Sequence, residues 1–168
     1  MRTTKTGAGQ RAGSGPGRRE VWVLEKGLPR ICPHPLVDHL GHRMLLATDL
    51  SSASSDVDAR AIELAQAAGA HLLVLAIIPS DASPDAAHRK SLAALVRRAR
   101  RRGIDAKGEI TSGDPADAIL RVAAASRADA IIIGDSQWRG WKNAGCECGH
   151  VILHSPCAVL RTHAPTAA

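Results

Sequence analysis

The sequence predicts an α/β fold: an open, doubly wound, parallel five-stranded sheet with helices on both faces. From residue 43 onward, apolar runs alternate five times with segments of helical periodicity. The runs are continuous, as in "HLLVLAIIP", which is typical of strands buried on both faces of a parallel sheet. The 168 residues include no Phe and no Tyr. The core must therefore be built from Ala, Val, Leu and Ile, which suits close packing of helices on a sheet.

Turn and capping residues divide this part of the chain into its elements. Ser55 or Asp56 can cap the first helix and Gly69 ends it, while Gly103 ends the second. Pro115 suits the first position of the third. The predicted elements, in order, are a strand over 43–49, a helix over 55–70, a strand over 71–79, a helix over 83–103, a more exposed strand over 104–113, a helix over 114–128, a strand over 129–135, a helix over roughly 145–154 and a strand over 157–163.

Residues 1–42 are predicted to be a basic, largely disordered extension of the domain over 43–168. Residues 1–43 carry eight Lys or Arg and three Asp or Glu, so most of the formal charge of +6 lies there. The first twenty residues have almost no apolar side chains to bury. Residues 21–43 hold scattered apolar positions broken by prolines, so a short strand or loose packing on the domain is expected. Translation that starts at Met44 is an alternative account of the boundary.

Composition and motifs exclude several classes of function. The longest uncharged apolar run, "LLVLAII", is too short to cross a bilayer, and no apolar segment of a secretory signal follows the basic start. Four cysteines without such a signal indicate reduced thiols in the cytoplasm. No nucleophile–base motif or Walker A loop is present, so we expect no enzyme. The arginines of "VRRARRRG" complement a helix C-terminus, and nucleic acid is not an expected partner.

Residues 43–163 resemble the universal stress protein family. The resemblance rests on "RMLLATDLS", on "GEITSGDPADAILRVAAASRADAIIIGD" and on "AGCECGHVILHSPCAVLR". It implies a sheet with strand order 3-2-1-4-5, usually in a homodimer. It also implies a regulatory or binding module of the stress response, whose protein partner the sequence does not name.

One class of that family binds ATP through a loop of the form Gly-x2-Gly-x9-Gly-Ser/Thr. The resemblance places Gly134 at the first glycine, Gly145 at the last and Cys146 at the Ser/Thr position. The two glycines are eleven residues apart where the pattern needs thirteen, and Gln137 stands where the second glycine belongs. Asp135 adds a negative charge next to the loop start. We therefore expect weak or absent ATP binding and no other cofactor, with an ATP-binding member of the family as the alternative.

Other candidate nucleotide-binding residues lie at the ends of the predicted strands. Ligands of doubly wound sheets bind beyond the carboxyl ends of the strands, where the strand order reverses. The resemblance suggests that Asp49 contacts a nucleotide, but a turn-forming role explains it equally well. The remaining candidates at these ends are Ala47, Thr48, Ile77 and Ile133.

The stretch "NAGCECGHVILHSPC" has the composition of a metal-binding segment. Cys146 and His150 are four residues apart and share a helix face, whereas Cys148 points elsewhere. A tetrahedral zinc site needs four converging ligands, and Cys32 and His34 could complete one only if the extension folds back. We therefore predict no metal site and favour buried thiols, with a thiol or metal redox sensor as an alternative function.

The segment 157–162 is predicted to be the last strand and to lie at the edge of the sheet. Such an open edge, with apolar Val159 and Leu160, tends to pair with another chain. The resemblance implies antiparallel pairing there. We expect a homodimer through this strand.

Overall fold

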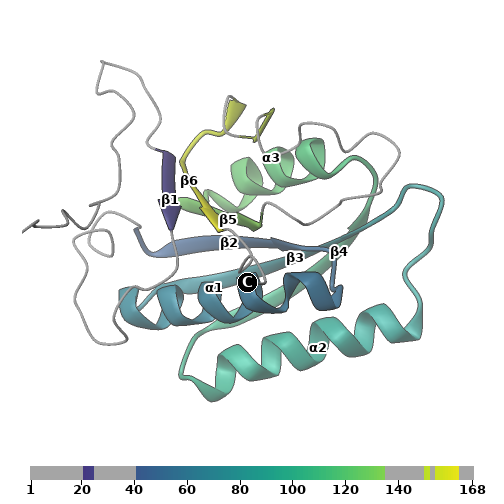
Figure 1. Ribbon diagram of the computed structural model, residues 1–168, viewed down its shortest axis with the longest axis horizontal. Helices are drawn as coiled ribbons and strands as arrows, with labels where there is room; N and C mark the ends of the chain where they lie inside the picture. Colours follow the sequence, from purple (N-terminus) through teal and green to yellow (C-terminus); the bar gives the residue numbers. More distant parts are fainter. Residues whose placement is uncertain (1–20, 25–40, 135–149, 152–153, 163–168) are drawn as a thin grey trace, which may run out of the picture.

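The computed structural model describes residues 21–24, 41–134, 150–151 and 154–162. At the centre is a parallel sheet with strand order β1-β6-β5-β2-β3-β4. Helices α1 (Ser55–Ala68) and α2 (Ala86–Arg101) cover one face, and α3 (Pro115–Ser126) covers the other (Figure 1). The strands are β1 (Val21–Leu24), β2 (Arg43–Thr48), β3 (His71–Ile78), β4 (Ala106–Ser112), β5 (Ala130–Gly134) and β6 (Ala158–Thr162).

The predicted α/β fold class and strand order are confirmed. Strands β4, β3, β2, β5 and β6 lie in the order 3-2-1-4-5 of the five expected strands, and each neighbouring pair is parallel. Alternate residues of β2 contribute to two separate cores, with Leu46 on the side of α1 and α2 and Leu45 on the side of α3. Both side chains are fully buried. In the described part of the chain, none of the helices is long and apolar enough to span a bilayer.

The predicted end of α1 and start of α3 are confirmed, whereas α2 spans Ala86–Arg101 and is shorter at both ends than the predicted 83–103. Gly69 follows α1 with a φ of 60°, in the left-handed region that favours glycine, and its N–H donates to the last carbonyls of the helix. Asp114 caps α3 by accepting the N–H of Asp117, and Pro115 is its first residue. At the start of α2, the carboxylate of Asp85 accepts a backbone N–H, and this bond is the main cause of the lowered pKa of that carboxyl.

The helix α1 begins at Ser55, as predicted, but the predicted capping residues are wrong. Neither Ser55 nor Asp56 caps the helix, because a short 3₁₀ turn over Ser52–Ser54 leads directly into it. Ser54 occupies the capping position, but its Oγ donates to the Ser51 carbonyl at 2.8 Å instead of accepting a helix N–H. The helix start is therefore fixed by the turn that precedes it.

Strand β1 corrects the predicted position of the last strand. It pairs in parallel with β6, with Val21 opposite Val159 and Leu24 opposite Thr162, so β6 is an inner strand (Figure 1). The sequence of β1, "VWVL", explains this pairing, because β-branched and aromatic residues favour strands. Without β1, the outer backbone groups of β6 would have no neighbour among the strands that the structure describes. Of the predicted extension over 1–42, these four residues are thus part of the sheet.

Asp129 joins the amino-terminal ends of β2 and β5. Its Oδ2 accepts the N–H groups of His42 at 3.0 Å and Arg43 at 2.9 Å. Gly41 has a φ of 68°, and a Cβ added there would lie 2.4 Å from the Cβ of Asp129. Glycine is needed at this position for both its conformation and its close approach.

We expect Asp129→Ala to lower the free energy of unfolding by about 2 kcal/mol, because two hydrogen bonds to a carboxylate are lost. Asp129→Asn keeps an oxygen that can accept both bonds and should cost clearly less. Urea denaturation of the two variants measures this difference. Equal losses for Ala and Asn would contradict the assignment of the effect to these bonds.

Candidate functional site

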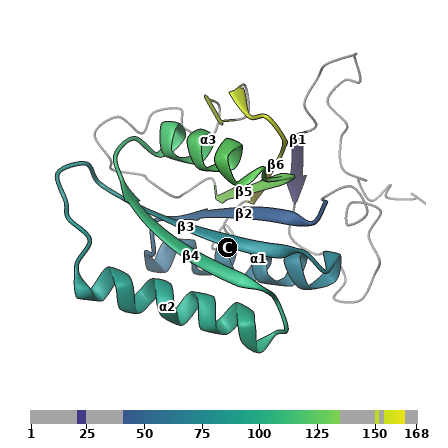
Figure 2. The same ribbon diagram turned by 180° about the vertical axis from the view of Figure 1, so that it is seen from behind.

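The order of the strands defines the end of this sheet at which ligands bind. The chain runs from β2 to β3 and β4 on one side, and β5 and β6 lie on the other. The strand order therefore reverses between β2 and β5, and Figure 2 shows the two strands side by side between the helical layers. Ligands of open α/β sheets bind beyond the carboxyl ends of such a pair. Here these ends are Thr48 and Gly134.

A chain of hydroxyl groups orders the turn that follows β2. The Thr48 Oγ1 accepts the Leu50 N–H at 3.1 Å and donates to the Ser54 Oγ at 3.0 Å, and Ser54 in turn donates to the Ser51 carbonyl. Thr48 and Ser54 are fully buried. Leu50 adopts a φ of 59°, in the left-handed region that a branched side chain rarely enters. The turn is thus fixed by its own polar groups and holds one strained residue.

Asp49 has the geometry of a turn former. Its Oδ1 accepts the Ser51 N–H at 3.0 Å, which is the hydrogen bond of an Asx turn. The side chain is half-buried. Of the two interpretations of Asp49, the turn role is therefore present, and contact with a nucleotide stays a prediction.

Asp58 is a buried carboxylate beside this turn, and the sequence interpretation missed it. It lies on the first turn of α1, is 7% exposed and is surrounded by Thr48, Ser54 and Arg98. Neither Asp58 Oδ1 nor the Arg98 Nη2, both buried, has a hydrogen-bond partner in the described part of the chain. A signal was present: Asp58 is three, four and seven residues before Ala61, Ile62 and Ala65, and therefore lies on the apolar face.

The environment of Asp58 raises the pKa of its carboxyl to about 6, from an ordinary value of 3.8. Burial is the main cause, because it disfavours the charged form, and the nearby Asp49 adds to it. The hydroxyls of Thr48 and Ser54 and the charge of Arg98 act in the opposite direction but do not offset burial. A carboxyl with a raised pKa at the ligand edge of a sheet marks this end as the candidate site.

The structure places the remaining candidates of β2, β3 and β5 side by side. Ala47, Ile77 and Ile133 are fully buried in the core on the α3 side, so any contact of theirs with a ligand would use backbone atoms. Gly134 is also buried and lies opposite Thr162 of β6. Those predicted residues that the structure describes therefore gather at one end of the sheet, with Thr48 and Asp49 as the polar members.

The sequence profile of the universal stress protein family matches residues 41–163. This chain belongs to the universal stress protein family. The match covers β2 through β6 and leaves out β1, so the added strand lies outside the part that the family shares. A comparison with functionally curated proteins gives no significant match.

Solved structures share the fold of this universal stress protein. A universal stress protein in complex with cAMP is 26% identical, with a TM-score of 0.60, over 74% of this chain and 98% of the other. One from Archaeoglobus fulgidus in complex with dAMP is 22% identical, with a TM-score of 0.56, over 73% and 98%. One from Arabidopsis thaliana with AMP bound is 17% identical, with a TM-score of 0.54, over 75% and 93%.

The rest of the predicted phosphate loop and most of the cysteine-rich segment lie outside the described residues. These positions include Gly145, Cys146 and Cys148, and the candidate zinc ligands Cys32 and His34 also lie outside the described residues. Among the residues that the structure does describe, no three His, Cys, Asp or Glu side chains gather as a metal site requires. The Cys157 Sγ of this universal stress protein lies 3.7 Å from the Ser155 Oγ, and the Cys157 N–H donates to the same oxygen at 3.1 Å. Cys157 is thus part of the turn before β6.

Proposed function

We propose that this universal stress protein is a cytoplasmic regulatory or binding module of the stress response, not an enzyme, with weak or absent ATP binding. The observation that carries the proposal is the turn after β2. Its Leu50 and Ser51 N–H groups already donate to the side chains of Thr48 and Asp49. They are therefore not available to a phosphate, and the carboxylates of Asp49 and Asp58 oppose one.

The loop that follows β5 must then supply the phosphate contacts. Its sequence is two residues shorter between Gly134 and Gly145 than the family's ATP loop, and it holds Asp135 and Gln137 where the pattern favours other residues. Binding of a single phosphate requires fewer N–H groups than binding of three. A cyclic or simple adenine mononucleotide is therefore the better candidate ligand, and the solved relative with cAMP supports testing this class.

Calorimetry with ATP and cAMP, each with and without Mg²⁺, tests the proposal. We expect ATP to bind with a dissociation constant of about 0.1 mM or weaker, because a like-charge pair near the phosphates costs some 3 kcal/mol, about a hundredfold in affinity. Recovery of ATP binding in Asp135→Ser would show that repulsion is the cause, and no recovery would leave the short loop responsible. Micromolar, Mg²⁺-independent ATP binding by the unchanged chain would overturn the proposal.

The homodimer through residues 157–162 is also a proposal. Val159 and Leu160 of strand β6 are buried in the two cores, one on each face of the sheet. Pairing of β6 with a second copy requires that β1 leave this edge. β1 and a second copy therefore compete for the same backbone groups.

A further inference from the structure

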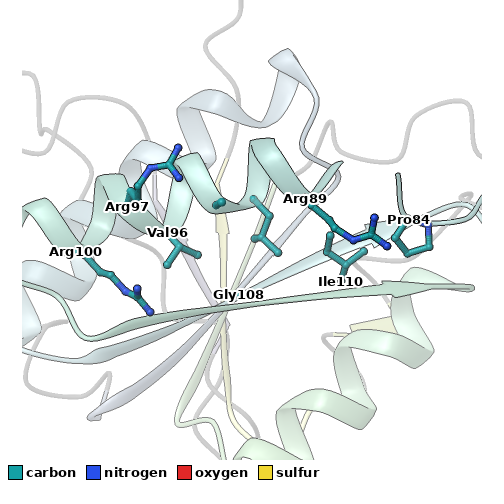
Figure 3. Close-up of a pocket in the computed structure, with 9 residues that line it drawn as sticks. Pro84, Arg89, Val96, Arg97, Arg100, Gly108 and Ile110 are labelled. Carbon is teal, nitrogen blue, oxygen red and sulfur yellow. The ribbon is translucent and has the colours of Figure 1, made fainter. Parts of the chain in front are cut away.

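A groove lies between α2 and β4, at the edge of the sheet opposite β1 (Figure 3). Its volume is about 740 Å³. Apolar atoms form its floor, and three arginines of α2 line it. The lining residues are Pro84, Arg89, Leu92, Ala93, Val96, Arg97, Arg100, Gly108 and Ile110.

The groove exists because β4 passes closely under the helix. A Cβ added to Gly108 would lie 2.9 Å from the side chains of both Leu92 and Val96. Figure 3 shows Val96 pointing from α2 toward the strand at Gly108. With no side chain at this position, the backbone of β4 lies open beside the apolar side chains of α2. The exposed Gly108 is thus both the contact point and the floor of the groove.

The outer edge of β4 has backbone groups available for pairing. Leu72 N–H donates to the Asp105 carbonyl at 2.9 Å, and Gly113 N–H donates to the Ile78 carbonyl at 3.2 Å. Because alternate residues of a parallel strand bond to the same neighbour, the odd-numbered residues of β4 bond to β3. The N–H and C=O groups of Gly108 and Ile110 therefore point away from the sheet. In the described part of the chain, no strand lies beyond β4.

The charge beside this edge is positive. Arg100 donates its Nε–H to the Ala106 carbonyl at 2.9 Å, which covers the start of the edge and holds a guanidinium there. Arg89 lies at the other end of the groove, near Pro84 and Ile110 (Figure 3). Among the residues that the structure describes, no carboxylate forms an ion pair with Arg89, Arg97 or Arg100.

We propose that this edge binds an acidic peptide segment in extended conformation, which adds a strand to β4 and places carboxylates against Arg89 and Arg100. The two arginines are eleven residues apart on α2, or about 16 Å. At about 3.3 Å per residue, the first and fifth residues of a strand are about 13 Å apart, a difference that the long arginine side chains can bridge. The segment that fits is acidic–any–apolar–any–acidic, with the apolar side chain against Ala93 and Ile110, which line the open side of the groove. Recognition of this kind combines main-chain hydrogen bonds with side-chain pockets.

A second copy of the chain does not fit this edge. Pairing of β4 with β4 about a two-fold axis would bring the arginines of both copies together at close range. Like charges that are partly removed from water repel each other strongly. Charge complementarity therefore selects a partner with carboxylates. The proposal concerns a different edge of the molecule from the nucleotide-binding end and does not depend on it.

The test uses the full chain and a labelled nine-residue peptide with Glu at its third and seventh positions, Leu at its fifth and Thr elsewhere. Fluorescence anisotropy should show saturable binding that weakens at least tenfold when both Glu are replaced by Gln. Arg89→Ala should weaken binding by a similar factor. Arg101→Ala is the matched control, because it removes an equal charge from an exposed position of α2 that does not line the groove.

Amide hydrogen exchange distinguishes strand addition from simple charge attraction. Saturating peptide should slow exchange at Gly108 and Ile110, whose N–H groups point outward. Unchanged exchange at both residues would overturn the proposal, as would absence of saturable binding or equal losses in Arg89→Ala and Arg101→Ala. A dimer of the free chain that the peptide dissociates would instead place a second copy on this edge and reject the acidic occupant.

Discussion

Asp58→Asn is expected to stabilise the folded chain by up to about 3 kcal/mol at pH 7.5 and to change its stability by less than about 1 kcal/mol at pH 4. The carboxyl is 7% exposed, and burial raises its pKa from 3.8 to about 6. At neutral pH the folded state must therefore hold a charge that it disfavours. Asn has the same shape and no charge, so the substitution removes this cost without opening a cavity.

The sign of the effect follows from proton binding. The folded chain binds the Asp58 proton more tightly than the unfolded chain, because its pKa is the higher one. The cost of the charge is complete above about pH 6, falls as the pH drops through the interval between the two values, and is nearly absent below pH 4. The unchanged protein should therefore gain stability from this group on mild acidification.

Urea denaturation at the two pH values measures both variants. Asp56→Asn is the matched control, since Asp56 is exposed on the same first turn of α1 and should respond by a few tenths of a kcal/mol at most. Destabilisation of Asp58→Asn at pH 7.5 would show that the hydroxyls of Thr48 and Ser54 and the charge of Arg98 together outweigh burial. A gain that is the same at both pH values would exclude titration of Asp58 as its cause.

Removal of residues 1–40 is expected to strengthen self-association of the chain by about tenfold or more. Strand β1 then no longer covers β6, and the backbone groups of Ala158–Thr162 can pair with a second copy. Each backbone hydrogen bond that no longer competes contributes about 1 kcal/mol, and a difference of 1.4 kcal/mol is a factor of ten. Sedimentation velocity over a range of concentrations measures the change.

Removal of residues 1–20 alone is the control for this experiment. It deletes the basic start of the chain but leaves Val21–Leu24 in place. We expect its association to match that of the full chain at moderate salt. Identical sedimentation of the two shortened chains would show that β1 does not limit access to β6, and a monomer in every case would reject the proposed homodimer.

The sequence predicted the parts of the fold that depend on many residues at once. The continuous apolar runs of β2, β3 and β5 predict buried strands without any information on their neighbours, because a strand covered on both faces needs apolar residues throughout. Gly69 and Pro115 were equally clear, since each suits one backbone conformation. β1 was only one of two possibilities, because four residues show no periodicity and their pairing depends on a distant partner.

The candidate site was predicted less completely than the fold. Thr48 and Asp49 lie at the carboxyl end of β2, as predicted, because the end of an apolar run marks the end of a buried strand in the sequence. Asp58 was missed because acidic residues are common in the first turn of a helix, although its spacing to Ala61, Ile62 and Ala65 places it on the apolar face. The groove at β4 depends on the missing side chain of Gly108 and on three arginines at separate positions of α2, and no local pattern shows that they meet.

The absence of Phe and Tyr has a consequence for spectroscopy. The three tryptophans are Trp22, Trp138 and Trp141, so no aromatic side chain of this type lies anywhere in residues 41–134. Both cores around the sheet are aliphatic. Unfolding that is limited to these cores therefore changes the environment of no fluorescent side chain within them. Trp22 belongs to β1, opposite Leu160 of β6. A chain with Trp138 and Trp141 replaced would therefore have a single fluorescent residue, on the strand that pairs with β6.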